Sequence, residues 1–214
     1  MSQPKVTVMD YGIGNVFSVV RALSQVADVL FTEDPKAAAE ADRLVVPGVG
    51  AFADCMRQLE ARGMHEVVKK FADSGRPLLG ICVGMQMLFD RSEEFGHVEG
   101  LGIMPGRVAE IPNRTESGER RKIPHIGWSP LQVGPARAGW DGSVLSSLQP
   151  GATMYFVHSY SVIPDDPSHA LAVVDYEGYA VTAAVQSGQI FGTQFHPERS
   201  ASNGRALLNS FVTL

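Results

Sequence analysis

The sequence predicts an α/β fold in which a mostly parallel central sheet is flanked by helices and extended by antiparallel strands. Its first half alternates short β-branched runs with segments of helical periodicity, which is typical of a parallel sheet covered on both faces. Its second half is a series of short strand-like runs separated by turn residues, a pattern of antiparallel strands. No internal repeat, low-complexity tract or linker interrupts residues 1–214, so we expect a single domain.

The first half opens with a predicted strand, and a helix follows it. The strand is KVTVMD, and the helix presents Val16, Val19, Val20 and Leu23 at the spacing i, i+3, i+4 and i+7. The same alternation then repeats, with strands predicted at residues 29–31, 43–48 and 77–82 and helices at residues 52–60, 65–71 and from about residue 85.

The second half contains six predicted strands and one closing helix. The strands lie at residues 106–111, 122–128, 153–160, 170–176, 179–186 and 189–196. The short SGQ segment between the last two indicates a hairpin, and we expect all six to extend the first-half sheet. Leu207, Leu208 and Phe211 predict an amphipathic helix that packs back on the sheet.

Composition and charge exclude several classes of function. The 214 residues are 44% hydrophobic and carry a formal net charge of −5, so nothing suggests binding to nucleic acid or to an anionic membrane. The basic cluster Arg120, Arg121 and Lys122 lies in a polar stretch and predicts a solvated loop. Two cysteines, no signal peptide and no long apolar run lead us to expect a cytoplasmic protein.

One of the two cysteines stands where a nucleophile would be presented. Gly80, Cys82 and Gly84 form a G-x-C-x-G pattern after a buried-strand run and before a predicted helix. A sharp turn flanked by small residues lifts a reactive side chain out at the carboxyl edge of a sheet, and a helix amino terminus favours a thiolate. Cys82 could equally be a small core residue, the role we expect for Cys55 on its predicted helix.

A histidine and a carboxylate near the end of the chain could serve that thiol. His196 and Glu198 are two residues apart, so on extended backbone they project to the same side. Pro197 between them favours the extended conformation for His196. The carboxylate can then bind one imidazole nitrogen and leave the other for a thiol. A lone histidine would more often be structural, but the His-Pro-Glu arrangement together with an elbow elsewhere in the same chain favours catalysis.

Backbone N–H groups could supply an oxyanion hole. Val83 follows the predicted nucleophile, and a second donor is expected at Val49, which lies between Gly48 and Gly50 after a predicted strand. This second segment could also be a plain strand-to-helix turn. No pair of cysteines or histidines has metal-ligand spacing and no phosphate-binding glycine motif occurs, so we expect neither metal nor cofactor.

Six segments in order resemble the class-I, triad-type glutamine amidotransferases, and most closely the glutaminase subunits of imidazole glycerol phosphate synthases. They are DYGIGN, LVVPGVGAF, LLGICVGMQ, IPHIGW, MYFVHSY and FHPERS, and they span nearly the whole chain. Relatives that serve anthranilate or GMP synthesis typically carry histidine where this chain has Met85, which favours the histidine-pathway group. The resemblance implies a flavodoxin-like fold.

The resemblance also implies roles for individual residues. Cys82 would be the nucleophile, His196 the general base and acid, and Glu198 the carboxylate that orients the histidine. Val49 and Val83 would form the oxyanion hole. The glutamine substrate would be bound by Gly50, Gln86, His158, Ser159 and Tyr160.

The resemblance further implies a reaction and a partner. L-glutamine would be hydrolysed to glutamate and ammonia through a thioester, and the ammonia would pass to a cyclase subunit. That subunit, the other half of a heterodimer, would form imidazole glycerol phosphate and aminoimidazole carboxamide ribotide. The matches DYGIGN and FHPERS place the partner surface at Tyr11, Gly12, Asn15 and Arg199.

Two other readings share part of this pattern. A triad amidase or cysteine peptidase would keep the elbow and the histidine without the glutamine-binding residues. A non-catalytic regulatory subunit would keep the fold and lose the reaction, but such a chain usually lacks one of the three catalytic side chains, and all three are present here.

Overall fold

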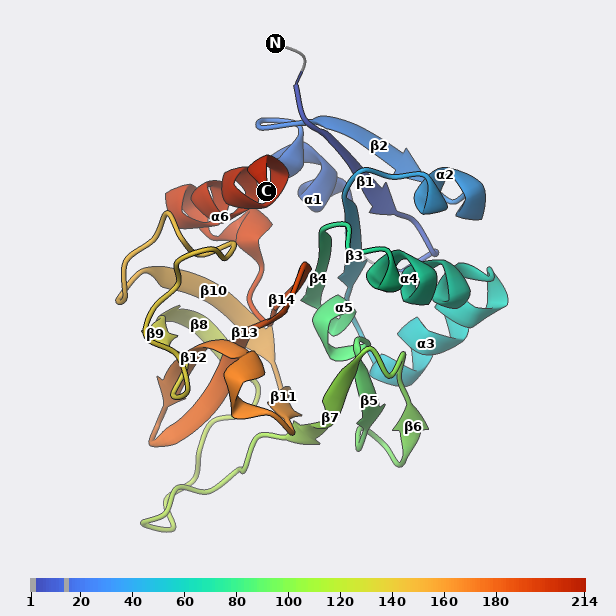
Figure 1. The fold of residues 1–214 in the computed structure, drawn as a ribbon. Coiled ribbons are helices and arrows are strands. Elements are labelled where there is room, and N and C mark those ends of the chain that lie inside the picture. The colour runs from blue at the N-terminus through green and yellow to red at the C-terminus, as the bar shows by residue number, and fades with distance from the viewer. Residues whose placement is uncertain (1–2, 14–15) are drawn as a thin grey trace.

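A computed structural model describes residues 3–13 and 16–214 and shows the predicted α/β architecture (Figure 1). Its main sheet has eight strands in the order β2-β1-β3-β4-β14-β13-β12-β9. The first five strands in this order, from β2 to β14, run parallel to one another. The strands of this sheet are β1 (Lys5–Met9), β2 (Asp28–Thr32), β3 (Leu44–Gly48), β4 (Leu78–Cys82), β9 (Gln132–Val133), β12 (Ala170–Tyr176), β13 (Tyr179–Ser187) and β14 (Ile190–Thr193).

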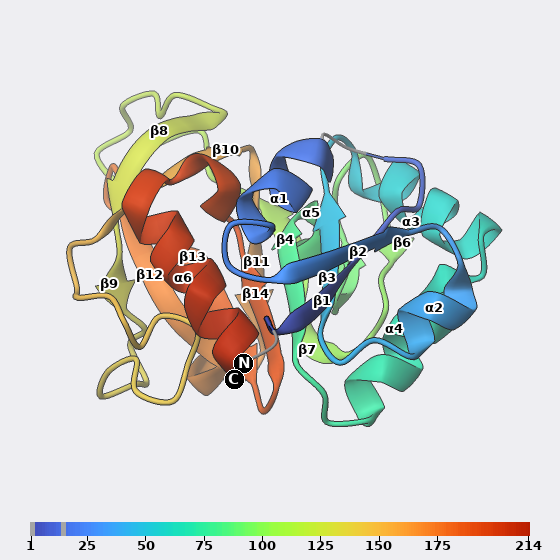
Figure 2. The same ribbon diagram turned by 90° about the horizontal axis from the view of Figure 1, so that it is seen from above.

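Helices cover both faces of the parallel part of the sheet (Figure 2). One face carries α1 (Val16–Leu23) and α6 (Ala201–Thr213), which touch each other. The other carries α2 (Pro35–Ala39), α3 (Phe52–Ala61) and α4 (Met64–Asp73), which also pack together. Their apolar residues join those of the strands in one buried core, which includes Cys55 as predicted. The short α2 was not predicted.

Among the residues that the structure describes, no helix is long and apolar enough to cross a membrane.

The parallel strands bring the predicted site segments to one edge. Gly48 at the end of β3 is paired in register with Cys82 at the end of β4, and Thr193 at the end of β14 is paired with Ile81. Three segments far apart in the sequence therefore end side by side. Ligands bind outside the carboxyl ends of such strands.

The prediction that all six later strands extend one sheet was wrong for three of them. The run at 106–111 lies in β7 (Met104–Glu110), within a second sheet of order β11-β7-β5-β6. The runs at 122–128 and 153–160 form β8 (His125–Pro130) and β10 (Thr153–His158), and within residues 3–13 and 16–214 these two strands pair only with each other. The remaining strands of the second sheet are β5 (Phe89–Ser92), β6 (Val98–Glu99) and β11 (Tyr160–Pro164). Alternating hydrophobicity identifies the buried face of a strand but carries no information on its neighbour.

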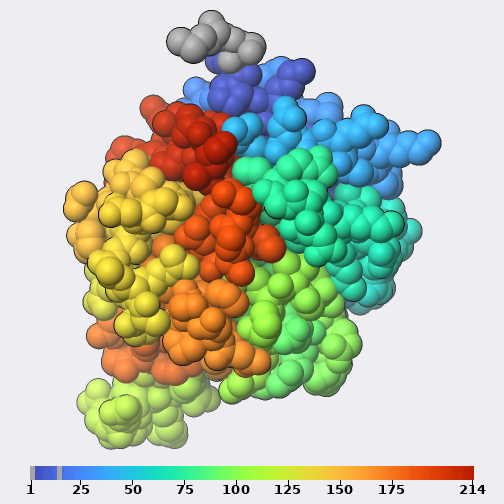
Figure 3. Space-filling model, viewed as in Figure 1, coloured from blue at the N-terminus to red at the C-terminus, as the bar shows by residue number. Residues whose placement is uncertain are grey.

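The basic cluster is also not the fully solvated loop that was expected. Arg121 is buried, and its guanidinium donates hydrogen bonds to the carbonyl oxygens of Pro112, Arg114, Tyr176 and Glu177. It therefore ties the loop at 112–122 to the turn after β12, although the tip of this loop projects from the molecule (Figure 3). The neighbouring residues 120 and 122 are exposed, as expected.

Candidate functional site

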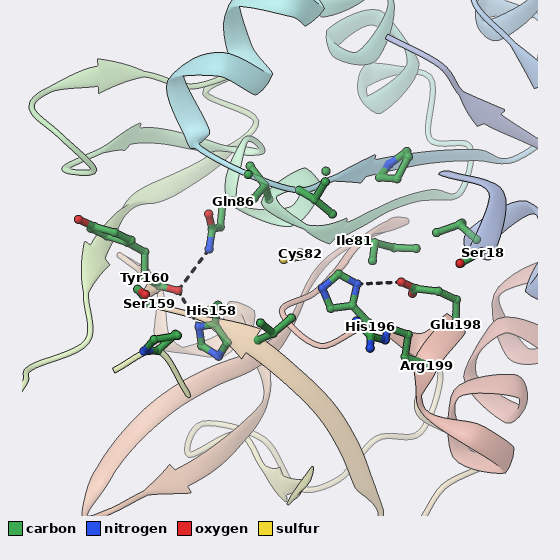
Figure 4. A pocket seen from close by; sticks show the side chains of 18 of the residues that line it. Ser18, Ile81, Cys82, Gln86, His158, Ser159, Tyr160, His196, Glu198 and Arg199 are labelled. Carbon is green, nitrogen blue, oxygen red and sulfur yellow. Dashed lines mark hydrogen bonds and ion pairs between the residues drawn. The ribbon is translucent and has the colours of Figure 1, made fainter. Parts of the chain in front are cut away.

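A cavity of about 770 Å³ lies at the carboxyl edge of β3 and β4. Cys82, His196 and Glu198 line it, and so do the predicted oxyanion residues Val49 and Val83. The predicted substrate residues line it as well: Gly50, Gln86, His158, Ser159 and Tyr160. The structure thus gathers every residue proposed for chemistry or substrate binding into one site (Figure 4).

Cys82 lies on a sharp turn between a strand and a helix. It is the last residue of β4, has φ 56° and ψ −115°, and precedes the short helix α5 (Val83–Gln86). A positive φ is unusual for a residue with a side chain and marks a strained turn. This is the elbow geometry that the sequence predicted, although the helix begins at Val83 rather than near Met85.

Glycines are required around this elbow because backbones meet there. A Cβ on Gly84 would lie 1.9 Å from the carbonyl oxygen of Val46, and a Cβ on Gly80 would lie 2.7 Å from the Gly84 carbonyl oxygen. A Cβ on Gly48 would lie 2.5 Å from the Gly84 nitrogen. The end of β3 and the first turn of α5 are therefore in direct backbone contact, with the Val83 N–H at the open end of the helix.

His196 lies between the thiol and a carboxylate (Figure 4). Its Nδ1 is 2.8 Å from Oε1 of Glu198, which leaves Nε2 for Cys82. Burial alone would lower the pKa of His196, but its hydrogen bonds with Cys82 and Glu198 raise this pKa to about 10. The imidazole consequently holds a proton at neutral pH, as a general acid must before it can deliver one.

Gln194 is a polar contact of the thiol that sequence reasoning missed. Its side chain is completely buried, with Nε2 3.7 Å from the sulfur of Cys82 and Oε1 3.0 Å from Nε2 of Gln86. Gln86 also donates to the carbonyl oxygen of Tyr160, 3.2 Å away. The chain of contacts therefore joins the nucleophile to the predicted substrate-binding segment. The sequence did contain a signal for Gln194, because it lies two residues before His196, and on extended backbone residues two apart project to the same side.

Two buried histidines stand behind that segment, and only His158 was predicted to act in the site. His158 Nδ1 donates to the carbonyl oxygen of Tyr160, 2.8 Å away, so its Nε2 can accept from His125 Nδ1, 3.3 Å away. His125 Nε2 in turn lies 2.9 Å from the hydroxyl of Ser129. Burial lowers the pKa of His158 to about 3 and that of His125 to about 4, so both rings are neutral.

A carboxylate at the cavity wall was also missed. Glu94 lies between β5 and β6 and lines the cavity, and its Oε2 accepts a hydrogen bond from the backbone N–H of Phe52 at 2.6 Å. The cavity therefore offers a negative group as well as backbone and hydroxyl groups at Ser159 and Tyr160. No sequence signal pointed to Glu94, because neither strand beside it was predicted.

The predicted partner residues differ in their exposure to solvent. The Tyr11 side chain is completely buried, so its assignment to an exposed partner surface was wrong. In sequence, a buried tyrosine before a glycine loop is indistinguishable from an exposed one, because the ring is apolar and the hydroxyl is polar. Gly12 is exposed, and Arg199 is exposed at the cavity with its guanidinium 4.6 Å from the ring centre of Tyr155. Asn15 lies outside the described residues.

Known proteins resemble this chain over almost its entire length. The family description "Glutamine amidotransferase class-I" matches residues 7–214. The imidazole glycerol phosphate synthase subunit HisH of Syntrophotalea carbinolica is 46% identical over 209 residues, which cover 96% of this chain and 98% of that protein. The subunit HisH 1 of Legionella pneumophila strain Lens is 41% identical over 210 residues, covering 98% and 99%.

Solved structures share the fold at much lower identity. A crystal structure described as a glutamine amidotransferase superposes with a TM-score of 0.71 at 17% identity, covering 98% of this chain and 99% of its own.

Proposed function

Because this chain is a member of the class-I glutamine amidotransferase family, we propose that Cys82, His196 and Glu198 hydrolyse L-glutamine to glutamate and ammonia. Identity of 46% and 41% over nearly whole chains assigns it to the glutaminase subunits of imidazole glycerol phosphate synthase, in histidine biosynthesis. The single observation that carries the catalytic assignment is the Cys82 elbow facing the His196–Glu198 pair inside one cavity.

The first half of the reaction forms a thioester. The Cys82 thiolate attacks the side-chain amide carbon of glutamine, and negative charge develops on the amide oxygen. Backbone N–H groups of Val83 and of the loop around Val49 stabilise that oxygen. His196 then gives its proton to the departing nitrogen, which leaves as ammonia, while Glu198 holds the imidazole in place.

The second half releases glutamate. Once His196 is neutral, it takes a proton from a water molecule that attacks the thioester carbon. The same oxyanion donors act again, and collapse of the intermediate releases glutamate and the Cys82 thiolate. His196 keeps the proton that it took from water. Each group thereby ends the cycle in its starting state.

The amino-acid end of glutamine would contact the polar residues that line the cavity away from the triad. Its ammonium suits the Glu94 carboxylate and its carboxylate suits the N–H and hydroxyl groups at Ser159 and Tyr160. Gln86 supports this wall through the Tyr160 carbonyl, and Gly50 lines the cavity beside it.

The proposed partner is the cyclase subunit that consumes the ammonia. Ammonia released into neutral water is protonated and loses its nucleophilicity, so direct transfer between docked sites protects the product. Ile126 and Trp128 are 55% and 52% exposed on one side of β8, and Trp128 lies edge-on to Tyr155 with ring centres 6.0 Å apart. The Arg199 guanidinium lies over the Tyr155 ring and lines the cavity. We call the surface formed by Ile126, Trp128, Tyr155 and Arg199 the aromatic rim. We place the docking surface on this rim and Gly12.

The test is glutamate release from L-glutamine by the purified chain, alone and with a histidine-pathway cyclase subunit loaded with its ribonucleotide substrate. We expect strong stimulation by the loaded cyclase and loss of turnover in Cys82→Ser. Hydrolysis of peptides or γ-glutamyl peptides in preference to free glutamine would indicate the amidase or peptidase reading instead. Full turnover in Cys82→Ser would remove the catalytic assignment, and no turnover in any mixture would indicate a regulatory subunit.

A further inference from the structure

Two polar side chains that the reaction does not use are buried behind the oxyanion loop, residues 47–50. Tyr11 follows β1 and Cys55 lies on α3, and both are completely inaccessible to solvent. Neither lines the cavity, whereas Pro47, Val49 and Gly50 all do. The two side chains therefore contact the oxyanion loop from the side opposite to the substrate.

Each side chain binds one carbonyl of the loop. The Tyr11 hydroxyl donates to the carbonyl oxygen of Pro47 at 2.5 Å, and the Cys55 thiol donates to that of Val49 at 3.4 Å. The two side chains also contact each other, and burial raises the pKa of Cys55 to about 11 and that of Tyr11 well above its ordinary value. Both groups consequently keep their protons and remain hydrogen-bond donors.

These bonds fix which way two peptide groups of the loop face. In a trans peptide the carbonyl and the following N–H point in opposite directions. With the Val49 carbonyl turned to Cys55, the Gly50 N–H is turned toward the cavity that Gly50 lines. Glycines on both sides of Val49 would otherwise permit this peptide to rotate.

Rotation would matter because of the charge formed in the reaction. A carbonyl oxygen facing the cavity would place a partial negative charge beside the oxygen that becomes negative, where N–H groups are needed. We propose that Tyr11 and Cys55 act as positioning residues that hold the Pro47 and Val49 carbonyls of the oxyanion loop away from the cavity, a role that rests on the glutaminase function proposed above.

The Tyr11–Cys55 pair is itself held by the helix that follows the loop. Arg62, at the end of α3, donates from Nε to the carbonyl oxygen of Tyr11 at 2.8 Å. The Cys55 backbone N–H bonds the carbonyl oxygen of Ala51 at 3.1 Å, in the first turn of α3. The loop, its supporting pair and α3 therefore form one connected unit.

The activity test compares Tyr11→Phe and Cys55→Ala with the wild-type chain, each with the loaded cyclase subunit. Tyr11→Phe keeps the ring and removes only the hydroxyl. We expect kcat to fall about tenfold with KM for glutamine unchanged, less than the roughly 100- to 1,000-fold cost of deleting an oxyanion donor outright. The double variant should lose little more than either single variant, since both act on one loop. Cys55→Ser retains a donor and should recover part of the loss.

The control is Val68→Ala, which truncates a completely buried side chain on α4 away from the loop. It should lower the unfolding temperature without changing kcat. Unchanged kcat in Tyr11→Phe, with stability lowered as in Val68→Ala, would show that the pair is only structural.

A second measurement does not depend on activity. The carbonyl carbon resonances of Pro47 and Val49 report their hydrogen bonds by nuclear magnetic resonance. We expect both to move in Tyr11→Phe and in Cys55→Ala, and neither to move in Val68→Ala. If the wild-type chain hydrolyses no glutamine, the proposed function fails while these shifts still decide whether the pair holds the loop, and unmoved resonances would overturn the inference.

Discussion

The nucleophile lies on a strained turn beside a completely buried amide side chain. Cys82 is 5% exposed on a strained turn, and the completely buried Gln194 directs its amide nitrogen at the sulfur. Sulfur is a weak acceptor when neutral, but a thiolate accepts hydrogen bonds strongly. The Gln194 amide is therefore matched to the reactive form of Cys82.

Replacing Gln194 by leucine should lower kcat more than it changes the affinity for glutamine. The Gln194→Leu change removes the donor to the sulfur and one partner of Gln86, and we expect kcat to fall about tenfold, which corresponds to about 1.4 kcal/mol. Steady-state glutaminase kinetics with the cyclase subunit measure it. The matched control is Gln25→Leu at an exposed position, which should leave kcat unchanged. Equal kcat in the two variants would rule out this role for Gln194.

Residues were predictable where a local pattern implies local geometry. The elbow around Cys82 and the close pair His196 and Glu198 are of this kind, because strand alternation and glycine spacing act within a few residues. Gln194 and Glu94 were missed because their contacts join segments distant in sequence. The burial of Tyr11 was likewise set by packing against the loop after β3, which no local pattern reports.

At the level of elements, β8 and β10 form a two-stranded sheet that carries a pair of buried, neutral histidines, one on each strand. His125 is stacked against the rings of Phe156 and Tyr176, with ring centres 4.8 Å and 4.0 Å apart, and it contacts His158 on the neighbouring strand. Protonating either ring would place a charge in this apolar environment. The pair thus links the strand that carries the aromatic rim to the strand that leads into the substrate-binding segment.

This burial predicts loss of stability in mild acid. The folded-state pKa values of about 4 and about 3 lie below the unfolded value of 6.5, so the unfolded chain binds more protons as the pH falls below 6.5. At pH 5 the free energy of unfolding should be lower by about 2 kcal/mol for each histidine. His196 has the opposite effect on stability, because its pKa is raised to about 10. Its contribution to the free energy of unfolding is complete below pH 6.5 and is lost as the pH rises above 6.5.

Urea unfolding between pH 7 and pH 5 measures the effect. In His125→Phe, which keeps a ring between the two aromatic neighbours, the slope of stability against pH should fall to about half. A wild-type free energy of unfolding that is equal at pH 7 and pH 5 would contradict the burial of two neutral histidines.

Most first-half elements could be predicted because strand–helix alternation admits few topologies, so β1 to β4 and their helices other than α2 matched in order. The second half could not, because antiparallel runs can pair in several ways that leave the same residues buried. Only β12, β13 and β14 joined the main sheet as expected, while β7, β8 and β10 paired elsewhere. The parallel pairing of β14 with β4 brings His196 to Cys82 and requires knowledge of the whole sheet.

At the scale of the whole molecule, the aromatic rim places exposed apolar area directly beside the reactive cavity. Large exposed aromatic side chains next to a functional opening are typical of docking surfaces, and tryptophan is enriched among residues that dominate binding. Arg199 connects the rim to the cavity, because it contacts Tyr155 and follows Glu198.

Trp128→Ala should therefore weaken binding of the cyclase subunit by tenfold or more, in line with the roughly 2 kcal/mol typical of a central aromatic residue. Isothermal titration of the two subunits measures the affinity, and thermal unfolding confirms that the variant folds. Leu30→Ala, a change at a 50% exposed residue on the outer strand β2, serves as the control and should bind normally. Normal binding by Trp128→Ala would place the partner elsewhere.

The backbone contact between Gly48 and Gly84 sets where this chain can be re-engineered. Because no side chain fits at either position, a library that varies them would yield unfolded or inactive proteins. Glu94, Ser159 and Tyr160 also line the cavity, and their side chains can be exchanged without forcing two backbones apart. Attempts to direct the chain toward other carboxamides should therefore randomise these three residues and leave the elbow unchanged.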